Sequence, residues 1–218
     1  ATHLVFMGTM GLETGAWTPI VYGFREREDI LDLFEMTCGQ RLTYNYMRIG
    51  GVSDDLPNGF VDKARRFCDM LEKKWEEYNN LLSYNQIFIM RMAKVGVLPV
   101  DLAIDYGVTG PVLRGSGVKW DLRKNEPYSV YPELDFDIPV GTGELGQVGD
   151  AWDRYMVRMR EIKQSIMIIR QALDKMPSGD VRAKVGRIFK PAPGEVYFRA
   201  ENPRGELGFY VVSDGTAN

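Results

Sequence analysis

The chain has 218 residues, of which 44% are apolar and 26% charged, an ordinary balance for a globular domain with a buried core. Its 27 basic and 30 acidic residues give a formal charge of −3, which excludes the broad basic surface of a nucleic-acid-binding protein. The apolar runs fall well short of the roughly 20 residues needed to cross a bilayer, so any membrane association is expected to come through a partner.

Cysteine and histidine are scarce. Cys38 and Cys68 each stand alone in the sequence, and His3 is the single histidine. Metal sites need several such ligands at close spacing, so we expect no metal ligands in this chain. Two reduced, buried thiols are the simplest interpretation of the cysteines.

Apolar residues at spacings of three and four predict a series of helices. Gly39 is a plausible C-terminal stop for the second of them, and Pro57 precedes the third. In chain order the predicted helical segments are His3–Leu12, Arg25–Thr37, Asn58–Leu82, Gln86–Ala93, Pro99–Tyr106 and Asp150–Met176.

The last of these helices has the clearest pattern. Arg158 and Glu161 are among the charged residues that fall off its apolar stripe, so we expect them on other faces. The pattern is typical of a bundle helix, although a free coiled coil is an alternative. The stripe consists of Trp152, Tyr155, Met159, Ile162, Ile166, Ile169, Leu173 and Met176.

The C-terminal part has a different character. Val185–Pro193 is basic and extended, and Glu195–Arg199 and Glu206–Val212 are predicted strands joined by a turn at Asn202–Gly205. We therefore predict a mainly α, single-domain fragment covering 1–218. Residues 1–176 form a helical bundle with an irregular segment at 107–149, and residues 177–218 form an extended tail and a small β-hairpin. The absence of an initiator methionine suggests a piece of a longer protein.

The most informative stretch is Leu113–Gly141, LRGSGVKWDLRKNEPYSVYPELDFDIPVG. It mixes charged, glycine and aromatic side chains without a helical or strand period, which indicates a functional segment. The triplet that follows, Gly141, Gly143 and Gly146, matches the dinucleotide fingerprint, but the preceding Leu134–Val140 is too polar for a buried parallel strand. We expect a flexible surface loop there. The charged and aromatic residues of the stretch are Arg114, Asp121, Arg123, Lys124, Glu126, Trp120, Tyr128, Tyr131 and Phe136.

Leu113–Gly141 closely resembles the signature segment of the 49-kilodalton subunit family of respiratory complex I, the NADH–quinone oxidoreductase. Further blocks resemble the same family, in the same order and over nearly the whole chain. These blocks are Thr14–Pro19 (TGAWTP), Phe24–Glu28 (FRERE), Asn45–Gly51 (NYMRIGG), Asp55–Pro57 (DLP), Pro203–Gly208 (PRGELG) and Val212–Gly215 (VSDG).

The resemblance implies a helical bundle similar to the large subunit of nickel–iron hydrogenases, without the cysteine pairs that hold their metals. It implies that quinone is the substrate, reduced in a chamber between this subunit and an iron–sulfur subunit that holds the last cluster. Other peripheral- and membrane-arm subunits would be further partners. The complex would place this chain peripherally, on the cytoplasmic side of the membrane.

The resemblance also points to site residues. By motif position Val5, Thr9 and Phe24 would line the quinone chamber. Glu13 stands where the family usually has an aspartate, and would relay protons as the hydrogen-bonding partner of a histidine that lies upstream of Ala1. The polar path from the chamber toward the membrane arm would include Glu26, Arg27 and Glu28.

Two other functions stay open. The chain could be a non-catalytic helical scaffold or assembly subunit, or the large subunit of a hydrogenase-type membrane-bound complex. The electron donor is open as well. Only about twenty residues separate Met176 from Glu195, a short tail similar to that of relatives that accept electrons from a reduced deazaflavin or ferredoxin instead of NADH.

Overall fold

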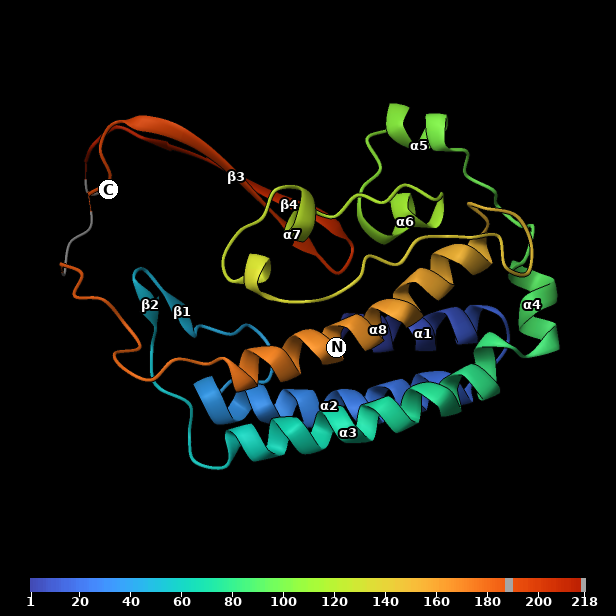
Figure 1. Cartoon of the computed structure of the whole chain (residues 1–218), viewed down its shortest axis with the longest axis horizontal. Helices are drawn as coiled ribbons and strands as arrows, with labels where there is room; N and C mark the ends of the chain where they lie inside the picture. The colour runs from blue at the N-terminus through green and yellow to red at the C-terminus, as the bar shows by residue number, and fades with distance from the viewer. Residues whose placement is uncertain (187–189, 217–218) are drawn as a thin grey trace.

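The computed structural model describes residues 1–186 and 190–216, and long helices dominate it (Figure 1). α1 packs on α2 and α8, and α3 packs on the same two helices, so their apolar faces share one core. No helix in this part of the chain is both long and apolar enough to cross a membrane. The four long helices are α1 (Thr2–Glu13), α2 (Thr18–Cys38), α3 (Phe60–Tyr78) and α8 (Ala151–Asp174).

The close approach of α1 and α2 depends on glycine. A Cβ added to Gly8 would lie 2.6 Å from the Cα of Ile20, and one added to Gly23 would lie 2.6 Å from the carbonyl oxygen of Leu4. Glycine therefore lets the two backbones pack in direct contact. This packing places the residues of α1 beside those of α2 that the sequence selects for the site.

The predicted ends of the second and third helices need small corrections. α2 begins at Thr18, seven residues before the predicted start, with a proline in its first turn. It ends as predicted at Gly39, which adopts a left-handed conformation with φ of 67°. α3 begins after Gly59 and passes at Tyr78 into a π-helical turn, Asn79–Ser83, before the short α4 (Gln86–Met92) and α5 (Val100–Asp105).

α8 confirms the central part of the predicted apolar stripe. Trp152, Tyr155, Met159, Ile162 and Ile166 are all buried, and the helix begins at the Asp150 cap. Ile169 and Met176, at the far end, are exposed. The charged face differs from a solvated one, because two of its members, Arg158 and Glu161, are buried as well.

The segment predicted to be irregular, 107–149, contains short helices. α6 (Gly110–Gly115) and α7 (Leu122–Asn125) are followed by a 3₁₀ turn, Tyr131–Glu133. The short helices were missed because four to six residues are too few to show a period. Residues 134–140 then run along α8, whose Gln164 and Gln171 side chains accept hydrogen bonds from the backbone N–H groups of Asp137 and Asp135.

The glycine triplet belongs to a surface loop, but one that is anchored. The backbone N–H of Gly143 donates to Asp153 at 2.8 Å, and Gly141 packs so closely on Gly115 that a Cβ there would overlap its carbonyl oxygen. The sheets within the described residues are two antiparallel hairpins, so the parallel sheet of a dinucleotide-binding fold does not accompany the triplet.

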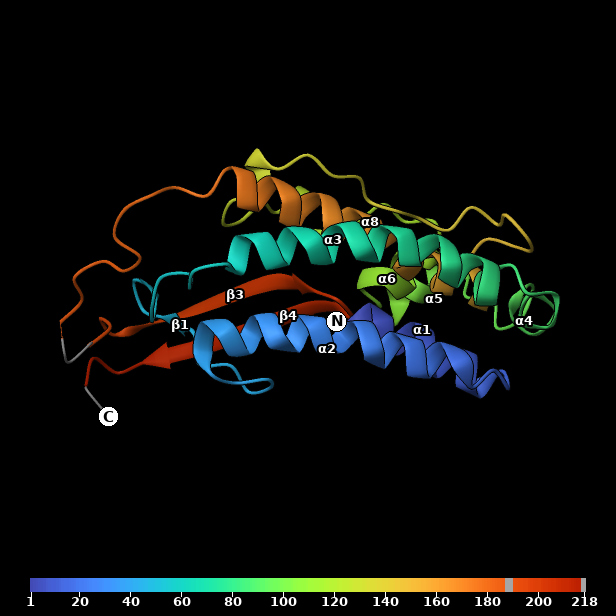
Figure 2. The same cartoon turned by 90° about the horizontal axis from the view of Figure 1, so that it is seen from below.

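The larger hairpin pairs β3 (Gly194–Asn202) with β4 (Gly205–Ser213) around a two-residue turn, in register from Gly194–Ser213 to Asn202–Gly205. It confirms the predicted strands and extends each by several residues. Its turn end packs on α6 and α7, while the rest projects along the bundle (Figure 2). The smaller hairpin, β1 (Met47–Arg48) and β2 (Gly51–Val52), was not predicted.

The prediction of a mainly α chain is confirmed in part. About half of the chain is helical, and a two-stranded antiparallel sheet lies near the C-terminus. Both cysteines are free thiols, but Cys68 is buried whereas Cys38 is only half-buried. The predicted extended segment Val185–Pro193 lies partly outside the described residues. The likeness to the hydrogenase large subunit stays a prediction.

Candidate functional site

A cavity of about 460 Å³ opens beside the start of α1, and we call it the α1 cavity. Val5 and Thr9 line it together because residues four apart lie on one helical face. Arg27 reaches the same cavity from α2. Three of the residues selected from the sequence therefore meet in one place. The other lining residues are Ala1, Thr2, His3, Phe6, Leu42, Tyr44, Arg158, Pro203 and Arg204.

The remaining selected residues lie elsewhere. Glu13 is exposed at the C-terminal end of α1, and Phe24 is exposed on α2. Glu28 pairs with Arg41, from the loop after α2. Consecutive residues of a helix point about 100° apart, so the predicted polar path of Glu26, Arg27 and Glu28 is not a continuous chain of contacts.

Glu26 is buried and faces α3. Its carboxylate accepts two hydrogen bonds from Arg25, at 2.8 and 2.6 Å. Burial and the nearby Glu26 carboxylate raise the pKa of Tyr78 on α3. This pair therefore joins α2 to α3 on the side of α2 away from the α1 cavity.

Arg158 is the most deeply buried cation of the α1 cavity, with 9% of its surface exposed. One guanidinium nitrogen donates to the carbonyl oxygen of Arg154 at 2.7 Å, and the group lies 4.2 Å from the ring centre of Phe6. Burial, together with the positive charges of Arg154, Arg114 and Arg204, lowers the pKa of Arg158 to about 10 against the pull of Glu161. Its positive charge is thus held in an unfavourable environment.

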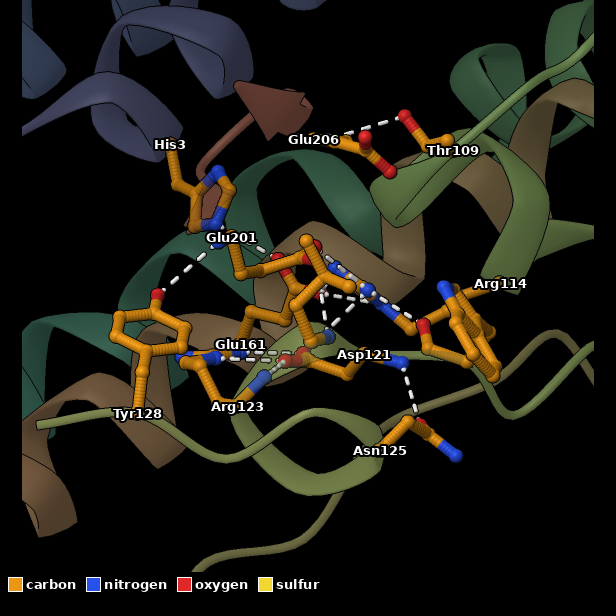
Figure 3. A network of polar contacts seen from close by, with 12 residues as sticks. His3, Thr109, Arg114, Asp121, Arg123, Asn125, Tyr128, Glu161, Glu201 and Glu206 are labelled. Carbon is orange, nitrogen blue, oxygen red and sulfur yellow. Dashed lines mark hydrogen bonds and ion pairs between the residues drawn. The ribbon is translucent and has the colours of Figure 1, made fainter. Parts of the chain in front are cut away.

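A second group of charges lies behind this cavity (Figure 3), and we call it the Arg114 network. The Arg114 side chain is 1% exposed and donates to Glu161 of α8 at 2.7 Å and to Glu201 of β3 at 2.8 Å. It also donates to the carbonyl oxygen of Trp120 at 2.9 Å and lies 3.4 Å from Asp121. One guanidinium therefore joins α6, α8 and β3.

Asp121 holds the start of α7 in the Arg114 network. Its carboxylate accepts the backbone N–H of Arg123 at 2.9 Å and that residue's guanidinium at 2.9 and 2.6 Å. Burial opposes ionisation of Asp121, but Arg123 and Arg114 outweigh it and lower the pKa of this carboxyl. For Glu201, burial dominates and the Asp121 charge adds to it, so the pKa of Glu201 is raised.

His3 connects the two sites. Its Nε2 lies 2.8 Å from the Glu161 carboxylate, and its ring borders the α1 cavity. It also borders a smaller cavity of about 190 Å³ beside the Arg114 network. Burial disfavours ionisation of Glu161, but His3 and Arg114 together lower its pKa. Charge at the α1 cavity and charge in the network are therefore coupled through one carboxylate.

Sequence reasoning selected part of the Arg114 network. Arg114, Asp121 and Arg123 all lie in the stretch that its composition marked as functional. Glu161 and Glu201 are 47 and 87 residues from Arg114 and were not chosen. In a single sequence the available signal was the unusual density of charge on a long bundle helix, which does not identify partners.

The cavity, the charge network and the bundle together describe a helical protein that buries much of its charge beside an open chamber. Comparison with known proteins gives the family. The family model described as "Respiratory-chain NADH dehydrogenase, 49 Kd subunit" matches residues 13–192 and 184–218. The chain belongs to this family.

The relatives agree with that assignment, and each is a D-type subunit of an NADH-quinone oxidoreductase. The chain is 53% identical over 216 residues to the one numbered 2 in Anaeromyxobacter dehalogenans (strain 2CP-C), covering 99% of this chain and 57% of the relative. It is 50% identical over 218 residues to that of Chlorobium luteolum, covering 99% of this chain and 55% of the relative. The same identity holds for the protein of Chlorobaculum tepidum, of which 54% is covered. The chain thus spans just over half the length of these relatives.

Proposed function

We propose that this chain forms part of the wall of a quinone-reduction site in an NADH:quinone oxidoreductase, as one domain of a longer subunit with a hydrogenase-like helical bundle. The observation that carries the proposal is the meeting of Val5, Thr9 and Arg27 in the α1 cavity. The family membership and the names of the relatives support the same activity.

The lining of the α1 cavity suits a quinone ring. Phe6, Leu42 and Tyr44 supply apolar and aromatic surface, and such surfaces bind flat apolar rings and exclude water. Arg27 is a fixed donor that can hydrogen-bond a carbonyl oxygen and stabilise the negative charge that develops as electrons arrive. Thr9 donates its hydroxyl hydrogen to the Phe6 carbonyl oxygen at 3.0 Å, which leaves the hydroxyl oxygen as an acceptor.

The electrons would come from an iron–sulfur cluster held by a partner subunit, since quinone reduction needs an electron source beside the chamber. Within the described residues, no group of three or more His, Cys, Asp and Glu side chains could hold a metal ion. NADH is the proposed donor, following the relatives' names. Reduced deazaflavin and ferredoxin are the alternatives. The complex would hold the chain peripherally, at the cytoplasmic side of the membrane.

The proposal predicts that filling the α1 cavity weakens quinone binding. Val5→Phe adds a ring to the cavity wall, and such overpacking changes binding by roughly 1–3 kcal/mol. In the assembled complex we expect the KM for a short-chain quinone to rise about tenfold, since 1.4 kcal/mol is tenfold in binding. Val130→Phe, at an exposed position outside this cavity, is the control. An unchanged KM for Val5→Phe would favour the scaffold function instead.

Glu13 is the proposed proton relay. It is exposed, and within the described part of the chain its side chain makes no hydrogen bond or ion pair, so it is available to a histidine from the rest of a longer subunit. A histidine–carboxylate pair can supply protons to a reduced quinone near neutral pH.

Glu13→Gln should lower quinone-reductase turnover in the complex by about 10²-fold, the usual lower limit of general acid–base catalysis. Glu13→Asp restores the residue usual in the family and should retain turnover. The measurement is the pH profile of kcat for both variants. Equal turnover in Glu13→Gln and the parent complex would remove Glu13 from the mechanism.

A further inference from the structure

Three arginines line the α1 cavity, and its lining includes no aspartate or glutamate. Arg27, Arg158 and Arg204 come from α2, α8 and the β3–β4 turn. None of the three forms an ion pair with another described residue. The contrast with Arg114, which meets three carboxylates, shows that this chain matches its other deeply buried guanidinium internally.

Arg158 is the strongest of these signals. A guanidinium that is nine-tenths buried loses most of its hydration, and a ring face and one carbonyl oxygen replace only part of it. The positive charge of Arg204 disfavours it further. Buried charges are stable when an opposite charge lies beside them, so the cavity lacks a negative group at this end.

The surroundings indicate what supplies that group. Leu42 and Tyr44, at the cavity, expose 61% and 48% of their surfaces. A free inorganic anion would neutralise the arginines but leave this apolar surface in water. A protein face would cover the apolar residues and present a charged side chain at its centre, as specific interfaces do. Arginine also binds a carboxylate through two parallel hydrogen bonds.

We propose that the α1 cavity receives the carboxylate of an aspartate or glutamate from the partner subunit, which pairs with Arg158 and Arg204. The proposal rests on the proposed function, because it assigns this face to the partner that holds the iron–sulfur cluster. Arg27 remains directed to the quinone. The cavity is then both a chamber wall and a specific joint between two subunits.

The direct test places a photo-crosslinking amino acid, p-benzoylphenylalanine, at Arg204 in the full-length subunit within the complex. Arg204 is exposed on a turn, so the substitution does not disturb the core. We expect a crosslinked partner peptide that contains aspartate or glutamate. A crosslink only to this same subunit, to a peptide without an acidic residue, or to no protein would overturn the proposal.

A second test reverses the charge. Arg158→Glu should reduce the iron–sulfur subunit co-purified with the tagged complex at least tenfold, and Arg204→Glu should weaken retention and make it sensitive to NaCl. Arg160→Glu is the control, since Arg160 pairs with Glu144 outside the cavity. A lysine at the crosslinked acidic position should restore retention of the Arg158→Glu variant, which separates lost pairing from misfolding.

The two proposals fail in different ways. If Arg204→Glu and Arg158→Glu keep the partner at all salt concentrations while quinone reduction falls, the carboxylate joint is wrong and the quinone site stands. If Val5→Phe leaves the quinone KM unchanged while both charge reversals release the partner, the quinone wall is wrong and the joint stands.

Discussion

Arg114 and Arg158 are both buried beside α8, and they differ in what neutralises them. Arg114 meets carboxylates from three separate elements of the chain, whereas Arg158 meets a carbonyl oxygen and an aromatic ring. A charge that is matched within the chain ties its elements together. A charge left unmatched inside a cavity is available to a group from outside. One helix thus carries a charge used for folding and one suited to assembly.

The two environments are separated by a single turn of α8. Arg158 and Glu161 are three residues apart, so they lie on neighbouring positions of one helical face. Glu161 belongs to the Arg114 network and also contacts His3 at the α1 cavity. A change of charge in the cavity is therefore expected to reach the network through this carboxylate.

Removing the matched arginine should have the largest effect. Arg114→Met leaves the buried carboxylates of Asp121, Glu161 and Glu201 without their shared partner, and breaking a buried pair in this way costs about 3–5 kcal/mol. Urea unfolding of the full-length subunit measures the loss.

Arg158→Met is the matched control for that comparison, since it removes a comparably buried guanidinium that has no carboxylate partner among the described residues. We expect the free energy of unfolding of the isolated subunit to change by no more than about 1 kcal/mol, because relief of desolvation offsets the lost contact with Phe6. A loss equal to that of Arg114→Met would contradict the distinction between the two sites.

The carboxylates of the network should differ among themselves. Glu161→Gln removes a group whose pKa is lowered in the fold, so we expect a loss of about 3 kcal/mol at pH 7. Glu201→Gln removes a group whose pKa burial raises, and its loss should be smaller, about 1 kcal/mol. Urea unfolding of both variants measures the difference.

The pH dependence follows from the directions of these pKa shifts. Glu161 contributes stability above its unfolded pKa, near 4.5, and loses the contribution as pH falls through its lower folded pKa. Glu201 has the opposite sign, because its stability contribution is present at low pH and is lost as pH rises through its raised folded pKa. The Glu161→Gln deficit should therefore shrink below pH 4.5 in urea unfolding. A deficit independent of pH would place its origin in packing.

Much of the fold followed from periodicity. Apolar residues at helical spacing located the four long helices, because a helix that packs on a core needs such a face. Leu207 and its neighbours in the tail alternate weakly, yet the Pro203–Gly205 turn was enough to locate the hairpin. The short helices α6 and α7 and the two-residue strands β1 and β2 were beyond reach, since elements of that length depend on tertiary contacts.

The site divides in the same way. The order of motifs along the chain determined the family, and it selected Val5, Thr9 and Arg27, which the structure brings together. The burial of Arg158 and Glu161 could not be inferred, because both fall off the apolar stripe of α8 and charged residues are usually exposed.

The sequence by itself determined which segments form long helices, where the terminal hairpin lies and to which family the chain belongs, because these depend on local period and on ordered motifs. Only the tertiary structure decided that Arg114 meets Glu161 and Glu201 while Arg158 meets no described carboxylate. Those pairings join residues 47 and 87 positions apart. They exist because the packing of α6, α8 and β3 brings the charges out of water together, and no local pattern encodes that meeting.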